Sequence, residues 1–338
     1  MAIALDAKGG DFGARVLIEG AVAAARQWGI ETVLVGPEEE ITAHLDALGA
    51  HGLPLSIRNA TQVVEMGESP AEALRKKKDS SIRIAFDLVK EGTAEAVVSA
   101  GNSGATLATA MVTLGRLHSV RPAIATMMPT LKRPVVLIDV GANVDCKPRH
   151  LLQFGIMGSI FSRQILSIHN PRVGLLSIGE EGYKGNDQVK KAYELFSASR
   201  LNFLGNVEGR DVFKGDVDVI VCDGFIGNIC LKLSEGLAES ILSMLKTEIS
   251  GSILGRLGYL LAQGPFRAFR KKVDYSEYGG APLLGINGIV IISHGRSGPK
   301  AVKNAIYAAH RLARQDLVNC LKTELDPGDA LLRAVETT

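Results

Sequence analysis

The sequence predicts an α/β protein in which a mostly parallel sheet carries helices on both faces. Short β-branched or leucine-rich runs alternate with segments of helical periodicity along the 338 residues. Several of these runs end in glycine-rich turns, which is typical of strand-to-helix connections. Hydrophobic side chains make up 46% of the chain, so a large core can form.

The predicted elements follow one another from the N-terminus onward. A strand at residues 3–7 precedes a helix at 14–28, and a strand at 32–36 precedes a helix at 38–49. Further strands are predicted at 94–98, 134–140, 172–178, 201–207, 217–222 and 288–293. We expect one α/β catalytic body, or two lobes, over residues 1–325, followed by a C-terminal tail at 326–338.

Composition excludes several classes of protein. A net charge of +2 argues against a general nucleic-acid-binding surface. The four cysteines form no CxxC pair, which favours reduced thiols and a cytoplasmic protein. The N-terminus lacks the pattern of a signal peptide, and the apolar runs fall short of the ~20 residues that span a bilayer.

Six glycine-rich turns follow predicted strands and define the candidate site. Their sequences are DAKGGD, SAGNSGA, DVGAN, SIGEEGYKGN, CDGFIGN and SHGRSG. Ligands of open α/β sheets bind beyond the carboxyl ends of strands, where loop amides and helix N-termini converge. We therefore expect these turns to share one pocket, although each glycine alone is equally explained by turn geometry.

The first two turns supply candidate phosphate ligands. The first contributes Asp6, Lys8, Gly9, Gly10 and Asp11, and the second contributes Gly101, Asn102 and Ser103. Amides that open a helix after GNSGA, together with a serine hydroxyl, suit an anion. The alternative is an ordinary turn in which Asn102 or Ser103 caps the helix.

The remaining turns contribute acids, amides and a lysine. Candidate substrate-binding residues are Asp139, Asn143, Asp145, Lys184 and Asn186. Candidate catalytic residues are Asp223, Asn228, Ser293 and His294. Helix capping and surface placement explain several of these equally well, two acids are few for a metal site, and no GxSxG motif supports a hydrolase triad.

Residues 248–272 form a predicted amphipathic helical segment that protrudes from the body. Apolar side chains recur at helical spacing and a basic cluster follows them. The candidate contact residues are Leu254, Leu257, Leu261, Phe266, Arg267, Arg270 and Lys271. This segment is expected to contact an anionic membrane surface, a second subunit or the core of the chain itself.

Taken together, the motifs resemble those of bacterial phosphate acyltransferases of phospholipid synthesis, the PlsX family. The resemblance runs nearly end to end through LDAKGGDFG, MGESPAEALRKKKDSS, VSAGNSGA, RPAIA, DVGANVDCKP, KGN, GNVEGRD, CDGFIGN, YGGAPLLGINGIVIISHG and KNAI. Two departures stand in the first motif, where Lys8 replaces the usual methionine and Ala14 the usual proline.

The resemblance implies an enzyme that moves a long-chain acyl group from acyl carrier protein to inorganic phosphate, without a metal or organic cofactor. It implies a fold related to phosphotransacetylases and to the isocitrate/isopropylmalate dehydrogenases. It also implies a homodimer, peripheral association with the inner face of the membrane, and delivery of acyl phosphate to a membrane glycerol-3-phosphate acyltransferase. Basic side chains at 75–78 or 267–272 are the candidates for docking the acidic carrier.

Three rival functions remain open at this stage. A short-chain phosphotransacetylase would use coenzyme A as the acyl carrier. An NAD-dependent dehydrogenase would use the related fold, although the GxGxxG fingerprint is absent. A lipid-binding regulator would have no catalysis, because fold kinship alone does not fix chemistry.

Overall fold

A computed structural model describes residues 2–117 and 120–325 of the chain. The strands are β1 (Ile3–Asp6), β2 (Thr32–Gly36), β3 (Leu55–Asn59), β4 (Ala96–Ser99), β5 (Ala123–Met128), β6 (Val135–Ile138), β7 (Arg172–Leu176), β8 (Asn202–Val207), β9 (Val219–Val221), β10 (Ala281–Leu284) and β11 (Ile289–Ile292). The helices are α1 (Ala14–Trp28), α2 (Glu38–Ala47), α3 (Pro70–Lys76), α4 (Ser81–Lys90), α5 (Ser103–Thr113), α6 (Pro148–Leu166), α7 (Asp187–Ser197), α8 (Gly224–Ser250), α9 (Ile253–Leu261), α10 (Gln263–Val273) and α11 (Pro299–Arg314). Two short 3-10 helices, η1 (Gly209–Phe213) and η2 (Tyr275–Tyr278), complete the set.

The strands form one 11-stranded sheet in the order β3-β2-β1-β4-β11-β10-β5-β6-β9-β7-β8. The first five strands of this order, β3, β2, β1, β4 and β11, are parallel to one another. The last four, β6, β9, β7 and β8, are also parallel to one another. Between these two sets, β10 pairs antiparallel with β11 and with β5, and β5 pairs antiparallel with β6. The two parallel halves therefore run in opposite directions, and their carboxyl ends lie on different edges of the sheet.

Two hydrophobic layers sandwich the sheet. On one face α1, α6 and α11 cover side chains such as Leu5, Ile138 and Ile291, all fully buried or nearly so. On the other face α4 and α5 cover side chains such as Val97 of β4, and α8 packs over β6, which carries Leu137. Because most central strands are buried on both faces, they appear in the sequence as continuous apolar runs.

The predicted fold class is confirmed, and most elements lie within a few residues of their predicted bounds. The predicted helix at 14–28 coincides with α1, and the predicted strand at 32–36 coincides with β2. Three strands, β3, β5 and β10, have no counterpart among the predictions. β5 (AIATMM) is rich in alanine and methionine, and β10 (APLL) is short and contains proline, so neither carries a strong strand signal.

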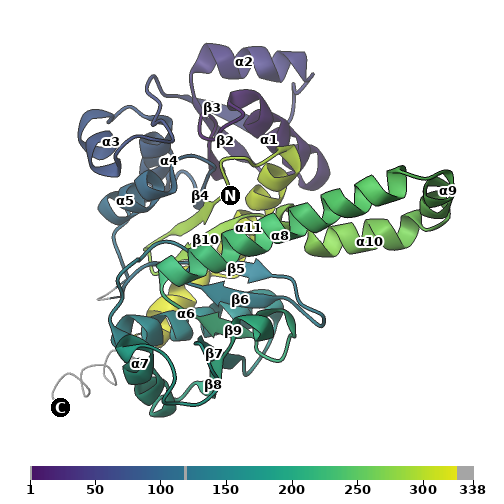
Figure 1. The fold of residues 1–338 in the computed structure, drawn as a ribbon. Helices are drawn as coiled ribbons and strands as arrows, with labels where there is room; N and C mark the ends of the chain where they lie inside the picture. The colour runs from purple at the N-terminus through teal and green to yellow at the C-terminus, as the bar shows by residue number, and fades with distance from the viewer. Residues whose placement is uncertain (1, 118–119, 326–338) are drawn as a thin grey trace.

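The amphipathic segment is helical, as predicted, and projects from the body (Figure 1). The projection is formed by the end of α8 together with α9 and α10, and we call it the hairpin (residues 240–273). Among the described residues no helix combines the length and the apolar character needed to span a bilayer. The predicted tail at 326–338 lies outside the described residues.

Candidate active site

Three of the six predicted turns meet at the carboxyl ends of β1, β4 and β11, and we call them the first cluster (residues 6–11, 99–103 and 293–297). The amide of Asp11 donates to the carbonyl of Gly295 at 2.8 Å, and the amide of Ser293 donates to the carbonyl of Ser99 at 2.8 Å. Gly9 and Gly101 approach so closely that a Cβ atom on Gly9 would lie 2.8 Å from the Gly101 nitrogen. Glycine is needed at position 9 because the two backbones are in contact there.

The buried carboxylate of Asp6 links the end of β1 to the end of β4 and to the start of α4. Its Oδ1 accepts a hydrogen bond from Ser81 Oγ at 2.6 Å and its Oδ2 accepts one from Ser99 Oγ at 2.8 Å. Burial raises the pKa of Asp6, and the hydrogen bonds from Ser81 and Ser99 offset part of that increase. Since the side chain is only 2% exposed, Asp6 positions the turns and does not itself face solvent.

The start of α5 combines a capping asparagine with an exposed serine. Asn102 Oδ1 accepts from the amide of Ala105 at 3.0 Å, while its Nδ2 donates to the carbonyls of Met66 and Glu68 at 3.0 and 2.9 Å. The Asn102 side chain is therefore used in the N-cap and in fixing the 65–68 loop. Ser103 is exposed in the first turn of α5, where unpaired amides point outward.

Lys8 lies in the first turn but is directed away from the start of α5. Its Nζ forms an ion pair with Glu40 Oε2 of α2 at 2.6 Å. Both side chains are about one third exposed. The predicted phosphate ligand is thus already paired with a carboxylate.

Ser293 and His294 face in different directions. Ser293 is 3% exposed, and a Cβ atom built on Gly280 would lie 3.0 Å from its Oγ. His294 is exposed, and its Nδ1 accepts from the amide of Arg296 at 3.2 Å. That hydrogen bond leaves the proton of the neutral imidazole on Nε2. The imidazole is thus exposed, whereas the Ser293 hydroxyl is buried.

A second cluster forms where β6 and β9 end, at residues 139–145 and 222–228. The buried carboxylate of Asp139 accepts from the amides of Ile124 and Ala142 at 2.9 and 3.0 Å, and from the amide and Nδ2 of Asn143 at 2.8 and 2.9 Å. Burial raises the pKa of Asp139, and these donors offset part of the increase. A Cβ atom on Gly224 would lie 2.7 Å from Asp139 Oδ2, so the two turns are in direct contact.

The other predicted residues of the second cluster lie around this carboxylate. Asp223 caps α8, because its Oδ1 accepts from the amide of Ile226 at 2.8 Å. Asn228 lies beside Gly141, with its Oδ1 3.8 Å from a Cβ atom built there, and is half-buried. Asp145 is exposed.

Arg121 belongs to the second cluster, although no site role follows from its place in the sequence. Its Nε donates to Asn143 Oδ1 and the residue is exposed. Together with Lys147 and Arg149 it makes the start of α6 electropositive: burial and these three cations lower the pKa of His150 to about 4. The only sequence signal for Arg121 is its position directly before β5 in RPAIA.

The turn at 177–186 lies far from the first cluster, although it follows β7, which pairs directly with β9 of the second cluster. Asn186 caps α7 by accepting from the amide of Val189 at 2.9 Å, and Lys184 Nζ lies 5.5 Å from the ring centroid of Tyr183. Strand β7 is six positions from β4 in the sheet, or about 29 Å at the usual strand spacing. The sheet does not place Lys184 and Asn186 beside Ser103.

Helix α8 connects the first and second clusters. Its N-cap is Asp223 in the second cluster, and Glu235, about three turns further along, lies within electrostatic range of His294 in the first. Burial raises the pKa of Glu235, and His294 acts in the opposite direction. Two cavities of about 210 and 10 Å³ in the described chain are lined by none of these turns. The expectation that the turns share a single pocket stays a prediction.

Comparison with known proteins identifies the family. The family model described as "Fatty acid synthesis protein" matches residues 1–320. A phosphate acyltransferase of Citrifermentans bemidjiense is 52% identical over 334 residues, which cover 98% of this chain and 95% of that protein. A phosphate acyltransferase of Syntrophotalea carbinolica is 54% identical over 324 residues, which cover 96% of this chain and 93% of that protein. The chain belongs to the phosphate acyltransferase family.

Solved structures show how this phosphate acyltransferase fold relates to others. A phosphotransacetylase from Streptococcus pyogenes aligns with a TM-score of 0.61 at 20% identity, covering 93% of this chain and 94% of that one. A 4-hydroxythreonine-4-phosphate dehydrogenase from Klebsiella pneumoniae aligns with a TM-score of 0.54 at 15% identity, covering 93% and 99%. At such identities the likeness establishes the fold alone, and it confirms the predicted kinship with phosphotransacetylases.

A phosphate acyltransferase has to hold phosphate, and two surfaces of this chain offer donors for it. The first is the start of α5 with Ser103, and the second is the electropositive edge around Arg121. The first has the amides of a helix start, and the exposed His294 belongs to the same cluster.

Proposed function

We propose that this phosphate acyltransferase takes a long-chain acyl group from acyl carrier protein and transfers it to inorganic phosphate. The product, an acyl phosphate, then serves a membrane glycerol-3-phosphate acyltransferase on the route to phosphatidic acid. The observation that carries the proposal is the first cluster, in which a helix start with an exposed serine and an exposed histidine are held on a buried carboxylate network. The family description, which refers to fatty acid synthesis, favours a long acyl chain.

Phosphate binds at the start of α5 in this proposal. The amides of the first turn and the hydroxyl of Ser103 donate to its oxygens, and the helix dipole favours the dianion. Gly9 keeps the wall of this site free of a side chain, because a Cβ atom there would collide with the backbone of Gly101. Asn102 and Asp6 contribute by fixing the loops, not by touching phosphate.

The chemistry is a direct attack of phosphate on the thioester. A phosphate oxygen forms a bond to the carbonyl carbon, the carbon–sulfur bond breaks, and the carrier thiolate leaves with the electron pair. Phosphate is itself the nucleophile, so no acyl-enzyme forms and positioning dominates catalysis. The Nε2–H of His294 donates a hydrogen bond to the leaving sulfur, which stabilises the developing thiolate, and the thiolate takes its proton from solvent.

The carrier docks on basic side chains, and ion pairing distinguishes the two candidate patches. At 75–78, Lys76 pairs with Glu72 at 3.0 Å and Lys77 with Glu68 at 2.5 Å. The cations Arg267, Arg270, Lys271 and Lys272 are exposed on α10, and none takes part in an ion pair among the described residues. The hairpin therefore has the larger unneutralised positive charge for an acidic carrier or an anionic lipid surface.

The tip of the hairpin suits a membrane surface. Leu254 and Leu261 are 83% and 91% exposed, and Leu257 is 53% exposed. Exposed leucines beside a basic cluster are typical of helices that lie in the headgroup region. Peripheral attachment at the cytoplasmic face would bring the enzyme to the acceptor of its unstable product.

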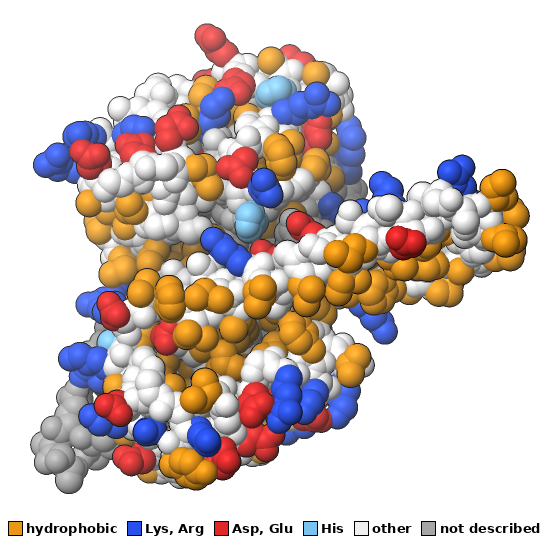
Figure 2. Space-filling model, viewed as in Figure 1, with side chains coloured by type: hydrophobic (Ala, Val, Ile, Leu, Met, Phe, Trp, Pro, Cys, Tyr) orange, Lys and Arg blue, Asp and Glu red, His pale blue; other side chains and the backbone are white. Residues whose placement is uncertain are grey.

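The exposed apolar face of α8 is suited to pack against a second copy of this chain. Exposed apolar side chains lie along one face at spacings of three and four residues, namely Ile226, Ile229, Leu233, Leu237, Ile241 and Met244. Figure 2 shows this orange stripe on the front of the molecule. A 27-residue helix is about 40 Å long, which is enough for two antiparallel copies to bury their stripes against each other.

One assay tests the proposed reaction. Purified protein is mixed with palmitoyl-carrier protein and phosphate, and free carrier thiol and hydroxylamine-trapped acyl phosphate are measured together. We expect both products to appear in equal amounts and only when phosphate is present. Palmitoyl-coenzyme A serves as the comparison donor, and a clear preference for it would contradict the carrier assignment.

A further inference from the structure

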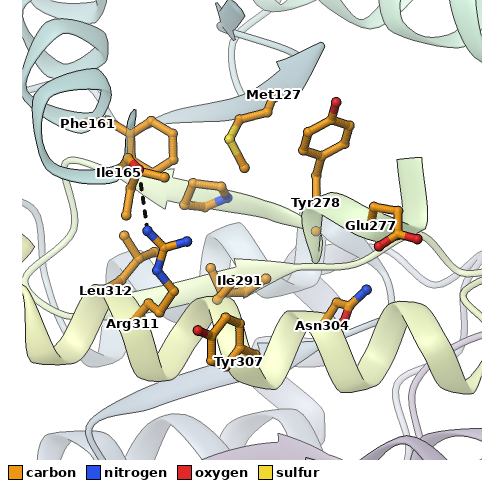
Figure 3. Close-up of a pocket in the computed structure, with 13 residues that line it drawn as sticks. Met127, Phe161, Ile165, Glu277, Tyr278, Ile291, Asn304, Tyr307, Arg311 and Leu312 are labelled. Carbon is orange, nitrogen blue, oxygen red and sulfur yellow. Dashed lines mark hydrogen bonds between the residues drawn. The ribbon is translucent and has the colours of Figure 1, made fainter. Parts of the chain in front are cut away.

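A cavity of about 210 Å³ lies between α6 and α11, on the sheet face opposite α4 and α5. Its walls are mostly apolar: Met127 of β5, Phe161 and Ile165 of α6, and Ile291 of β11 contribute to them. Figure 3 shows these side chains gathered around the open space, with Arg311 at one end and Glu277 at the other. None of the six glycine-rich turns lines this cavity.

The two charged groups at the rim differ in how they are paired. Glu277 forms an ion pair with Lys300 at 2.7 Å, so its charge is neutralised within the chain. Arg311 pairs with no carboxylate among the described residues, and its one hydrogen bond runs from Nη2 to the carbonyl of Ile165 at 3.4 Å. The guanidinium is only partly exposed and thus loses hydration without a counter-ion to replace it.

We propose that this cavity is a second ligand site, for a single-chain amphiphile with an anionic head. The chain lies among the apolar walls, and a carboxylate or phosphate head pairs with Arg311 in a charge-assisted hydrogen bond. An apolar cavity of about 150 Å³ holds a benzene ring, so one of about 210 Å³ accommodates about eight carbon atoms. The site is separate from the clusters of the proposed function and does not depend on them.

Calorimetric titration of the full chain with octanoate, octyl phosphate and 1-octanol tests this assignment. Octanoate and octyl phosphate distinguish a fatty-acid head from a phosphate head, and 1-octanol has the same chain without charge. Arg311→Met keeps an unbranched apolar stem and removes the charged guanidinium, and Arg314→Met makes the same change on an exposed position of α11 as the matched control. Ala308→Phe fills the cavity from α11.

We expect at least one of the two anions to bind the unchanged protein and the R314M variant equally. In R311M its affinity falls by about tenfold, as for a lost charge-assisted hydrogen bond, while 1-octanol binds as before. In A308F all three ligands fail to bind, although the thermal unfolding temperature stays close to that of the unchanged protein.

Three outcomes overturn the proposal. The first is equal binding of the anions to R311M and the unchanged protein. The second is binding of 1-octanol as tightly as the anions, which would make the cavity a purely apolar one. The third is full binding to a folded A308F variant. Activity with acyl-carrier protein is measured separately, so a failure here is distinguishable from a failure of the proposed reaction.

Discussion

The side-chain amide of Asn143 donates to the buried carboxylate of Asp139 at 2.9 Å. The same carboxylate accepts hydrogen bonds from three backbone amides of the 139–143 turn and from one amide of β5. It therefore fixes the conformation of the second cluster. Asp139 is fully buried, and nothing in its surroundings replaces these acceptor sites.

Replacing Asp139 with asparagine should destabilise the fold. One oxygen becomes an NH₂ group that faces N–H donors, and at least one buried amide loses its acceptor, so the free energy of unfolding should fall by about 1–3 kcal/mol. Urea unfolding measures this change. Asp145→Asn is the control, because that side chain is exposed, and an equal loss in both variants would argue against the network.

Replacing Lys8 with methionine should leave phosphate binding nearly unchanged. Lys8 is paired with Glu40 on α2, so its charge is not directed at the start of α5. We expect the KM for phosphate to stay within about twofold and stability to fall by no more than about 1 kcal/mol, as for a partly exposed ion pair. Steady-state kinetics at varied phosphate measures the first quantity, and a large rise in KM in K8M but not in Glu40→Gln would place Lys8 in the phosphate site after all.

Ser293 and His294 should respond differently to substitution. Ser293→Ala removes a buried hydroxyl that has no hydrogen-bond partner in the described structure, so kcat should change little. His294→Ala removes the proposed hydrogen-bond donor to the leaving sulfur, and kcat should fall by about 10²-fold or more. Loss of activity in S293A together with a trapped acyl-serine would contradict direct transfer.

Stability should depend on pH through His150. Its folded pKa is about 4, against the usual 6.5, because burial and nearby cations disfavour the imidazolium. Between these values the unfolded chain binds the proton and the folded chain does not, so stability is fully present above pH 6.5 and is lost as the pH falls toward 4.

Urea unfolding at several pH values in this window tests that dependence. His150→Gln keeps an acceptor for the Lys147 amide and should flatten the curve. His51→Asn is the control on an exposed histidine and should leave the slope unchanged.

Sequence patterns predicted the elements better than their assembly. Parallel strands such as β2 are predicted because they form apolar runs between turns. The strands β5 and β10 have weak strand propensity and are not predicted. That omission matters, because these two antiparallel strands reverse the direction of the sheet and separate the turns into clusters. Contacts such as Lys8 with Glu40 or Arg121 with Asn143 join residues 32 and 22 positions apart, and nothing in the local pattern specifies them.

Substitutions in the hairpin distinguish membrane binding from subunit contact. Leu257 and Leu261 are exposed at its tip, and replacing both with glutamate should release the protein from anionic phospholipid vesicles because two apolar contacts become charged. Activity with soluble acyl-carrier protein and the mass of the proposed dimer should both persist.

Leu237→Glu supplies the matched change on the α8 stripe. It should lower the dimer mass in light scattering, while membrane binding per chain is retained. If the tip variant instead dissociates the dimer and the stripe variant stays dimeric, then the hairpin tip is the subunit contact, and the exposed leucines at 254, 257 and 261 serve assembly in place of lipid.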